Sequence, residues 1–261
     1  MEERIKTEET ERNLRECHEV QQCEARPRAA WEPVSAGSFN VFLLFNLEAA
    51  WDEGHCILAL GPVDGPLETY SYYRHSTKLE APGIMACLRD PMTFAALEQA
   101  SGWIVHGEPG NWWNEHVNCA IALVCDEVSF NGVRAYAEQR RQHPGTYNLV
   151  TYNCLTFCDD ALRAGGIRLT ARSGRAVRTI IPKDAFKDVD DVRGARPFQA
   201  WKYWFPLGEP PADGLRTIQD APGQDKPLEW PYGRWAAGWE ESRGRGPVHL
   251  CQLTHGERPP S

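Results

Sequence analysis

The sequence predicts an α+β fold in which an antiparallel sheet packs against a helix. Apolar, β-branched and aromatic runs lie close together between residues 38 and 73, and another apolar run covers 117–125. In the segment 154–164 the apolar residues recur at helical spacing instead. The short connections between the first strands predict a meander, and the later helix would pack on its face.

The chain is long enough for one large domain or two small ones. At 261 residues it can bury roughly 70–75% of its unfolded surface without disulfides. Its composition, 42% hydrophobic and 25% charged, excludes wholesale disorder. Lys and Arg number 28 against 36 Asp and Glu, a net charge of −8. Because binding to phosphate backbones needs a basic footprint, we do not expect nucleic acid as a partner.

Three strands are expected in the first part of the chain. Residues 38–47 (SFNVFLLFNL) form a buried strand, and residues 55–60 (HCILAL) form the second. Residues 61–66 are dense in Gly and Pro, so they predict a turn. The third strand covers residues 68–73 (ETYSYY).

The rest of the expected core alternates between helices and strands. A short helix over 91–100 precedes a loop over 107–114 and a strand over 117–125. Ser129 signals the start of a helix that ends at His143-Pro144-Gly145. Residues 146–153 then lead into the helix 154–164, which Gly165 ends. No apolar run reaches the roughly 20 residues that span a bilayer.

Cys154 is the first residue of this last helix, and that position has chemical consequences. The helix dipole and the free backbone N–H groups stabilise a thiolate and lower the pKa of a thiol. The same N–H groups can bind an oxyanion. Cys154 is therefore the candidate nucleophile, although a buried structural cysteine is the alternative. Asn153 either shapes the oxyanion region or only caps the helix, which is the commoner role.

A nucleophilic cysteine needs a base, which the fold brings in from elsewhere in the chain. His55 opens a strand directly after Gly54, a place from which a rigid element can present an imidazole. We therefore expect Cys154 and His55 to lie within hydrogen-bond reach. The alternative is an inert histidine at the strand edge. For His75, His106, His116 and His143, which lie near expected loops or turns, we expect solvated surface positions.

The residues around Cys154 carry a resemblance to a known family. The stretch Tyr147-Asn148 followed by Asn153-Cys154 and Phe157 resembles the YN-x-x-x-x-NC-x-x-F helix of the lecithin:retinol acyltransferase-like group. This group is the circularly permuted branch of the NlpC-type papain-like superfamily. Gly54-His55 and the aliphatic run after it are similar to its base-bearing strand, and the order of His55 before Cys154 matches the permuted branch.

This resemblance implies a permuted papain-like fold and a cysteine hydrolase or acyltransferase. Cys154 would form a thioester and His55 would move the proton, with no metal or organic cofactor. The favoured substrate is a lipid acyl ester, as for a phospholipase, and the alternative is an amide bond in peptidoglycan or a peptide. Where the acyltransferases show NCEHF, this chain has Leu155-Thr156, which leaves the substrate class open. A binding module without enzymatic activity is a third interpretation.

A third polar group should orient the imidazole. If a hairpin is centred near Val63-Asp64, Tyr72 lies opposite His55, with Glu68 on the same face by period two. Tyr72 is the geometric choice for this role. Glu68 is the chemically better group and would be preferred in a different register.

The expected organisation has three parts. Residues 1–30 form a charged arm, residues 31–195 the permuted papain-like catalytic domain, and residues 196–261 an irregular extension packed on it. The extension carries five tryptophans, some of which would border the Cys154 cleft and contact a membrane peripherally, unless all five are ordinary packing residues: Trp201, Trp204, Trp230, Trp235 and Trp239.

The start of the chain is charged and has no apolar signal core, so we expect synthesis in the cytoplasm, compatible with export that needs no signal peptide. Family habits suggest an antibacterial toxin effector, which would have an immunity or inhibitor protein as partner.

Overall fold

The computed structural model describes residues 39–49, 54–76, 78–171, 179–194, 198–205, 216–217 and 248–249. The expected arm at 1–30 and most of the expected extension at 196–261 lie outside the described residues. All statements below concern the described part of the chain.

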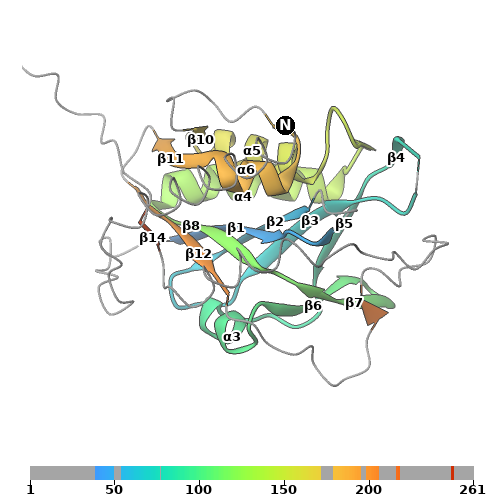
Figure 1. Cartoon of the computed structure of the whole chain (residues 1–261), viewed down its shortest axis with the longest axis horizontal. Coiled ribbons are helices and arrows are strands. Elements are labelled where there is room, and N and C mark those ends of the chain that lie inside the picture. The colour runs from blue at the N-terminus through green and yellow to red at the C-terminus, as the bar shows by residue number, and fades with distance from the viewer. Residues whose placement is uncertain are drawn as a thin grey trace, which may run out of the picture.

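One large curled sheet organises the molecule (Figure 1). Its order is β13-β7-β6-β5-β3-β2-β1-β8-β12-β14. The strands, in chain order, are β1 (Phe39–Asn46), β2 (His55–Pro62), β3 (Glu68–Tyr73), β5 (Ile84–Leu88), β6 (Trp103–Glu108), β7 (Asn111–His116), β8 (Cys119–Cys125), β12 (Phe198–Trp204), β13 (Arg216–Thr217) and β14 (Val248–His249). Every pair in this sheet is antiparallel except β13 with β7.

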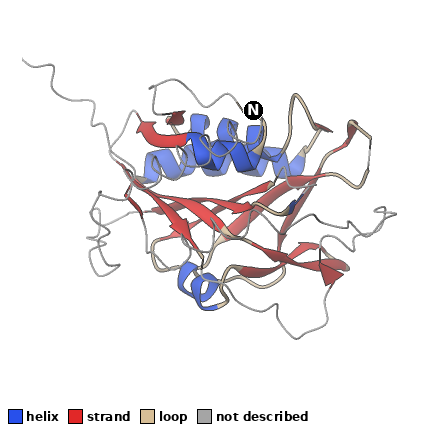
Figure 2. Cartoon of the chain, in the orientation of Figure 1, coloured by secondary structure: helices blue, strands red, loops and turns tan. Residues whose placement is uncertain are grey.

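Two smaller sheets and four helices complete the described fold. The strand β4 (Glu80–Pro82) pairs with β9 (Thr146–Asn148), and β10 (Ile167–Ala171) pairs with β11 (Val189–Gly194). The helices are α3 (Phe94–Gln99), α4 (Glu127–Gln142), α5 (Cys154–Ala164) and α6 (Pro182–Asp188). As Figure 2 shows, α4, α5 and α6 form a layer on one side of the sheet, and α3 lies on the other side.

The two faces of the sheet bury two separate apolar clusters, because successive strand residues point in opposite directions. On β2, Cys56, Leu58 and Leu60 belong to the cluster under α4, α5 and α6, which we call the helix face. Ile57 and Ala59 belong to the cluster on the other side, which contains Phe94 of α3 and which we call the α3 face. This division decides which polar side chains can meet.

The α+β class and the meander of the first three strands are confirmed. β1 pairs with β2 over its whole length, from Phe39↔Pro62 to Asn46↔His55, and β2 pairs with β3. The strands β1 and β2 are apolar on both faces, because helices cover one side of the sheet and the curled sheet itself covers the other. The finer expectation of a permuted papain-like fold stays a prediction.

Two local expectations are wrong. The segment 107–114 was expected to be a loop, but most of it belongs to the hairpin of β6 and β7, which turns at Gly110 with φ of +84°. Gly tolerates this left-handed conformation, so the two segments that flank it can pair.

The helix α4 begins at Glu127, two residues before Ser129, which was expected to signal its start. The Asp126 side chain caps the helix by accepting from the Ser129 N–H at 2.8 Å.

The beginning of the expected extension is part of the main sheet. β12 pairs with β8 from Phe198↔Cys125 to Trp204↔Cys119. Trp201 and Trp204 lie on this strand and pack against the α3-face and helix-face clusters, respectively. Trp230, Trp235 and Trp239 lie outside the described residues. Within the described ranges, no helix is both long and apolar enough to cross a membrane.

Candidate functional site

The N-terminus of α5 is built by a complete set of capping hydrogen bonds. The Asn153 Oδ1 accepts from the N–H groups of Leu155 and Thr156, at 3.0 and 3.2 Å. The Thr156 hydroxyl accepts in return from the Asn153 N–H at 2.6 Å, which makes a capping box. The Asn153 Nδ2 donates to the Ile180 carbonyl at 2.8 Å. The amide oxygen therefore has the capping role expected for Asn153, and the amide nitrogen ties the helix end to the carbonyls of Leu149 and Ile180.

Cys154, the first residue of α5, has its sulfur at a convergence of hydrogen-bond donors. The backbone N–H groups of Cys56 and Leu155 lie close enough to the sulfur to lower the pKa of the thiol, and the Tyr147 hydroxyl acts in the same direction. The Cys154 N–H in turn donates to the Tyr147 hydroxyl. The next turn of the helix carries Cys158, whose thiol points at the Cys56 carbonyl at 3.9 Å. α5 thus packs its thiol-bearing end directly on β2.

The Cys154 thiol is protonated in this arrangement. Its side chain is 2% exposed. Burial raises the pKa of the thiol to about 12, and the donors from Cys56, Tyr147 and Leu155, which lower the pKa, do not offset it. The activation that a helix N-terminus gives to an accessible thiol is outweighed here by the loss of water.

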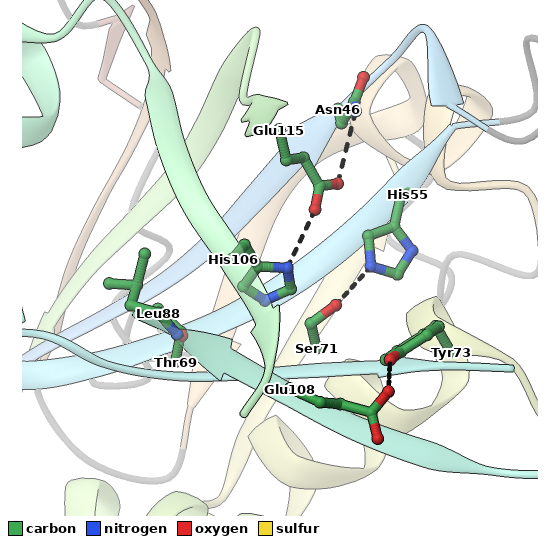
Figure 3. A network of polar contacts seen from close by, with 9 residues as sticks. All are labelled: Asn46, His55, Thr69, Ser71, Tyr73, Leu88, His106, Glu108 and Glu115. Atoms are coloured by element: carbon green, nitrogen blue, oxygen red, sulfur yellow. Dashed lines mark hydrogen bonds and ion pairs between the residues drawn. The ribbon is translucent and has the colours of Figure 1, made fainter. Parts of the chain in front are cut away.

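The structure does not bring His55 to Cys154. The His55 side chain leaves β2 on the α3 face, with Ile57 and Ala59, whereas Cys154 packs on the helix face. Its Nε2 lies 2.7 Å from the Ser71 hydroxyl (Figure 3). Ser71 is on the α3 face too, since its neighbours Tyr70 and Tyr72 are both in the helix-face cluster. The expected hydrogen-bond contact between thiol and imidazole is therefore absent from the described arrangement.

The two expected orienting residues also lie on the helix face, away from the His55 ring. The observed register pairs Leu58 with Tyr70, so its continuation sets Tyr72 opposite Cys56 instead of His55. A shift of one residue moves a side chain to the other face of a sheet. Tyr72 is fully buried and donates to the Pro144 carbonyl at 3.1 Å. Glu68 is exposed and pairs with Arg134 at 2.8 Å.

His55 belongs instead to a polar network inside the curled sheet (Figure 3). His106 of β6 and Glu115 of β7 are both fully buried, and the His106 Nδ1 lies 3.2 Å from the Glu115 Oε2. The geometry of this contact does not suit a hydrogen bond, since neither atom has a hydrogen-bond partner among the described residues, and the contact becomes an ion pair when the imidazole is protonated. The other Glu115 oxygen accepts from the Asn46 Nδ2 at 3.4 Å.

Glu115 carries the negative charge of this network. Burial would raise the pKa of its carboxyl, but His106, the charge of His55 and the Asn46 amide together lower it to about 2. Burial lowers the pKa of His55, the Glu115 charge opposes this, and His106 adds to the lowering. A buried carboxylate between two imidazoles is stable only while these partners surround it.

Sequence reasoning missed several residues at both places. The surface position expected for His106 is wrong because the hairpin of β6 and β7 curls its side chain under the sheet. Tyr147 was noticed only as part of the motif, although it contacts the Cys154 sulfur. Arg74 and Arg140, which lie over the rings of Tyr147 and Tyr152, have no signal in the linear pattern. In the part of the chain that the structure describes, no three His, Cys, Asp or Glu side chains are arranged to hold a metal ion.

Comparison with known proteins gives a single distant similarity to report. No family model and no curated protein matches the chain. The crystal structure of TseH, a Type VI secretion system effector, aligns with 16% sequence identity and a TM-score of 0.39. The alignment covers 64% of this chain and 93% of that chain. Similarity at this level is too low to assign a fold or a function.

Proposed function

We propose that the chain is a cysteine-dependent hydrolase or acyltransferase with Cys154 as the nucleophile. The observation that carries the proposal is the convergence of the Cys56 and Leu155 N–H groups on the sulfur at the first residue of α5. Backbone amides fixed by a helix end and a strand are the kind of preorganised donors that stabilise a thiolate and a developing oxyanion.

His55 is the proposed base, and the proposal requires its ring to change faces. The Cys154 sulfur contacts the backbone N–H of Cys56, so it lies one residue along β2 from His55. Gly54, which precedes His55, has a φ of +89°. Because the strand backbone sets the face of each side chain, the backbone at Gly54-His55 must turn so that the imidazole leaves Ser71 and reaches the helix face before it takes the thiol proton. The described arrangement would then be a resting state with a protonated thiol.

The proposed reaction balances without a cofactor. The thiol proton passes to the His55 imidazole, and the sulfur attacks the acyl carbon. The bond from that carbon to the leaving oxygen or nitrogen breaks, and the leaving group takes the proton from the imidazolium. Water, or an acceptor alcohol or amine, then cleaves the Cys154 thioester and restores the thiol. A lipid acyl ester is the favoured substrate, and a peptidoglycan or peptide amide is the alternative.

Product analysis tests the proposal. The full chain is incubated separately with a bacterial lipid extract and with peptidoglycan, and the products are identified by mass spectrometry. We expect a new product from one substrate that disappears in Cys154→Ala. Cys158→Ala is the matched control, because it removes a buried thiol one turn later on the same helix and should retain turnover per folded molecule. Equal turnover in wild type and Cys154→Ala would rule out the proposed nucleophile.

A binding module without enzymatic activity is the second candidate. The observation that favours it is the burial of Cys154, 2% exposed, on the opposite face of the sheet from His55. Under this interpretation the cysteine only fills the core. No Cys154-dependent product from either substrate, together with full folding of the wild type, would favour this second candidate.

The effector role stays a prediction as well. It is tested by producing the chain in the cytoplasm and, with an added signal peptide, in the periplasm of a bacterium. Growth inhibition that Cys154→Ala abolishes would support a toxic enzyme and justify a search for an immunity protein. Normal growth in both compartments, with folded protein present, would contradict it.

A further inference from the structure

A chain of aromatic and cationic contacts surrounds the Cys154 end of α5. The Tyr147 ring, whose hydroxyl contacts Cys154, lies 5.1 Å from the Tyr72 ring between centroids. The Arg74 guanidinium lies 5.6 Å from the Tyr147 ring centroid. The Arg140 guanidinium lies 5.8 Å from the Tyr72 ring and 4.6 Å from the Tyr152 ring. Two cations therefore lie against the tyrosine pair whose member Tyr147 contacts the thiol.

Neither cation is matched by a carboxylate among the described residues. Ion pairs do hold Arg134 to Glu68, Arg141 to Glu138 and Arg163 to Asp159, each at 2.7 or 2.8 Å. Arg74 and Arg140 take part in no such pair within the described ranges. In a chain with a net charge of −8, where acidic groups outnumber basic ones, two unmatched arginines beside one thiol are unexpected.

Parts of both guanidinium groups are withdrawn from water without a hydrogen-bond acceptor. The Arg74 Nη1 and the Arg140 Nε are buried and have no hydrogen-bond partner in the described structure. Leaving a buried charged donor unpaired costs free energy, so such groups are normally paired. Stacking on tyrosine rings stabilises the cations. The rings do not, however, accept the hydrogen bonds that the guanidinium N–H groups donate in their own plane. An anion would supply acceptors for both groups.

We propose that Arg74 and Arg140 form a binding site for a phosphate group beside Cys154. Guanidinium groups present paired donors that match phosphate oxygens, and charge-assisted hydrogen bonds of this kind are the strong ones. The inference extends to the substrate, whose acyl group would be carried on a phosphorylated molecule such as a phospholipid. This extension rests on the proposed function. Phosphate binding itself does not.

Binding of inorganic phosphate to the full chain provides the test. Phosphate is titrated by calorimetry at constant ionic strength, set with chloride. We expect Arg74→Gln and Arg140→Gln each to raise the Kd about tenfold. Arg134→Gln is the matched control, since it removes the same charge from an arginine paired with Glu68, and its Kd should stay within about twofold. If all three variants bind phosphate as the wild type does, or the wild type binds none, the proposal is wrong.

Two further measurements separate this site from folding and from catalysis. Circular dichroism checks each variant, and Arg140→Lys, which keeps the charge but loses the paired donors, replaces Arg140→Gln if the latter unfolds; we expect it to weaken binding too. Cys154→Ala should bind phosphate like the wild type, so a failure of the proposed nucleophile leaves this result standing. Unchanged phosphate affinity in folded Arg140→Lys and Arg74→Gln would overturn the proposal.

Vesicles identify the source of the phosphate. Cosedimentation is measured with neutral glycolipid vesicles, with and without phosphatidic acid. Binding that requires phosphatidic acid, and that falls in Arg74→Gln and Arg140→Gln but not in Arg134→Gln, assigns the site to a lipid headgroup. Binding of free phosphate without vesicle binding would overturn the phospholipid assignment and indicate a soluble phosphoester.

Discussion

The backbone N–H of Cys56 lies beside the sulfur of Cys154 and lowers the pKa of its thiol. Cys56 directly follows His55, so the thiol touches the strand that carries the expected base. The imidazole nevertheless leaves that strand on the opposite face, where Ser71 holds it. The thiol is therefore close to the His55 backbone but separated from the His55 ring by the sheet, and the first two predictions below depend on this arrangement.

In the absence of substrate, the Cys154 thiol should react slowly with iodoacetamide. Its pKa is raised from 9.0 to about 12, a shift of 3, so its thiolate fraction at pH 7.5 is about a thousandfold below that of an unperturbed thiol. Peptide mass spectrometry gives the labelling rate at each pH. We expect the rate to keep rising up to pH 10, and a plateau reached below pH 9 would contradict the burial described here.

Replacing Ser71 by alanine should release His55. The contact of 2.7 Å between the Ser71 hydroxyl and the imidazole is lost, and a hydrogen bond contributes about 1 kcal/mol, equivalent to about a fivefold change in population. If the ring then reaches the helix face, labelling of Cys154 at pH 7.5 should become a few times faster. The double variant Ser71→Ala/His55→Ala should lose this gain. Identical rates in Ser71→Ala and wild type would argue against His55 as the base.

The protein should lose stability as the pH falls below neutrality. The pKa of Glu115 is about 2 in the fold against 4.5 ordinarily, so its contribution is complete above pH 4.5 and is lost towards pH 2. A shift of this size corresponds to about 3 kcal/mol. The pKa of His55 is lowered from 6.5, so protonation of the unfolded chain also costs stability below that pH. Urea unfolding at several pH values between 7 and 3 measures the slope.

Glu115→Gln tests the assignment of that slope. The variant removes the buried carboxylate that faces His106 and His55, so we expect a loss of about 3 kcal/mol at pH 7, the contribution that the lowered pKa of Glu115 represents. Its stability should then change less than that of the wild type between pH 4.5 and 3. A variant whose stability falls as steeply as that of the wild type in this window would show that other carboxylates dominate.

Gly132→Ala should destabilise the contact of α4 with α5. A Cβ atom at residue 132 would lie 2.6 Å from the Ala164 carbonyl oxygen, closer than packing allows, so one helix must shift. Overpacking of this kind costs about 1 to 3 kcal/mol. Thermal unfolding gives the difference, with Asn131→Ala on the exposed side of the same helix as the control. Equal melting temperatures for both variants would contradict this close approach of the helices.

Much of the architecture follows from local pattern. The apolar alternation and turn residues between 38 and 73 are enough to predict β1, β2 and β3 in antiparallel order. Helical spacing and Asn153 predict α5 and place Cys154 at its first residue. These features depend on residues close together in the chain, so a sequence carries them openly.

The site depends on information of another kind. The expected pairing of Tyr72 with His55 missed by one residue, and a period of two turns that small error into the wrong face of the sheet. His106, near an expected loop, is buried because the β6 and β7 hairpin curls beneath β2 and β3. Burial of this kind is set by distant strands and leaves no local signal.

By itself, the sequence determined the fold class, the meander and the cysteine at a capped helix end, since propensity and periodicity act over a few residues. Only the tertiary structure decided that Cys154 is buried, that His55 faces Glu115 and Ser71, and that Arg74 and Arg140 lie over the rings of Tyr147 and Tyr152. The physical reason is that face, register and water exclusion depend on contacts between segments far apart in the chain.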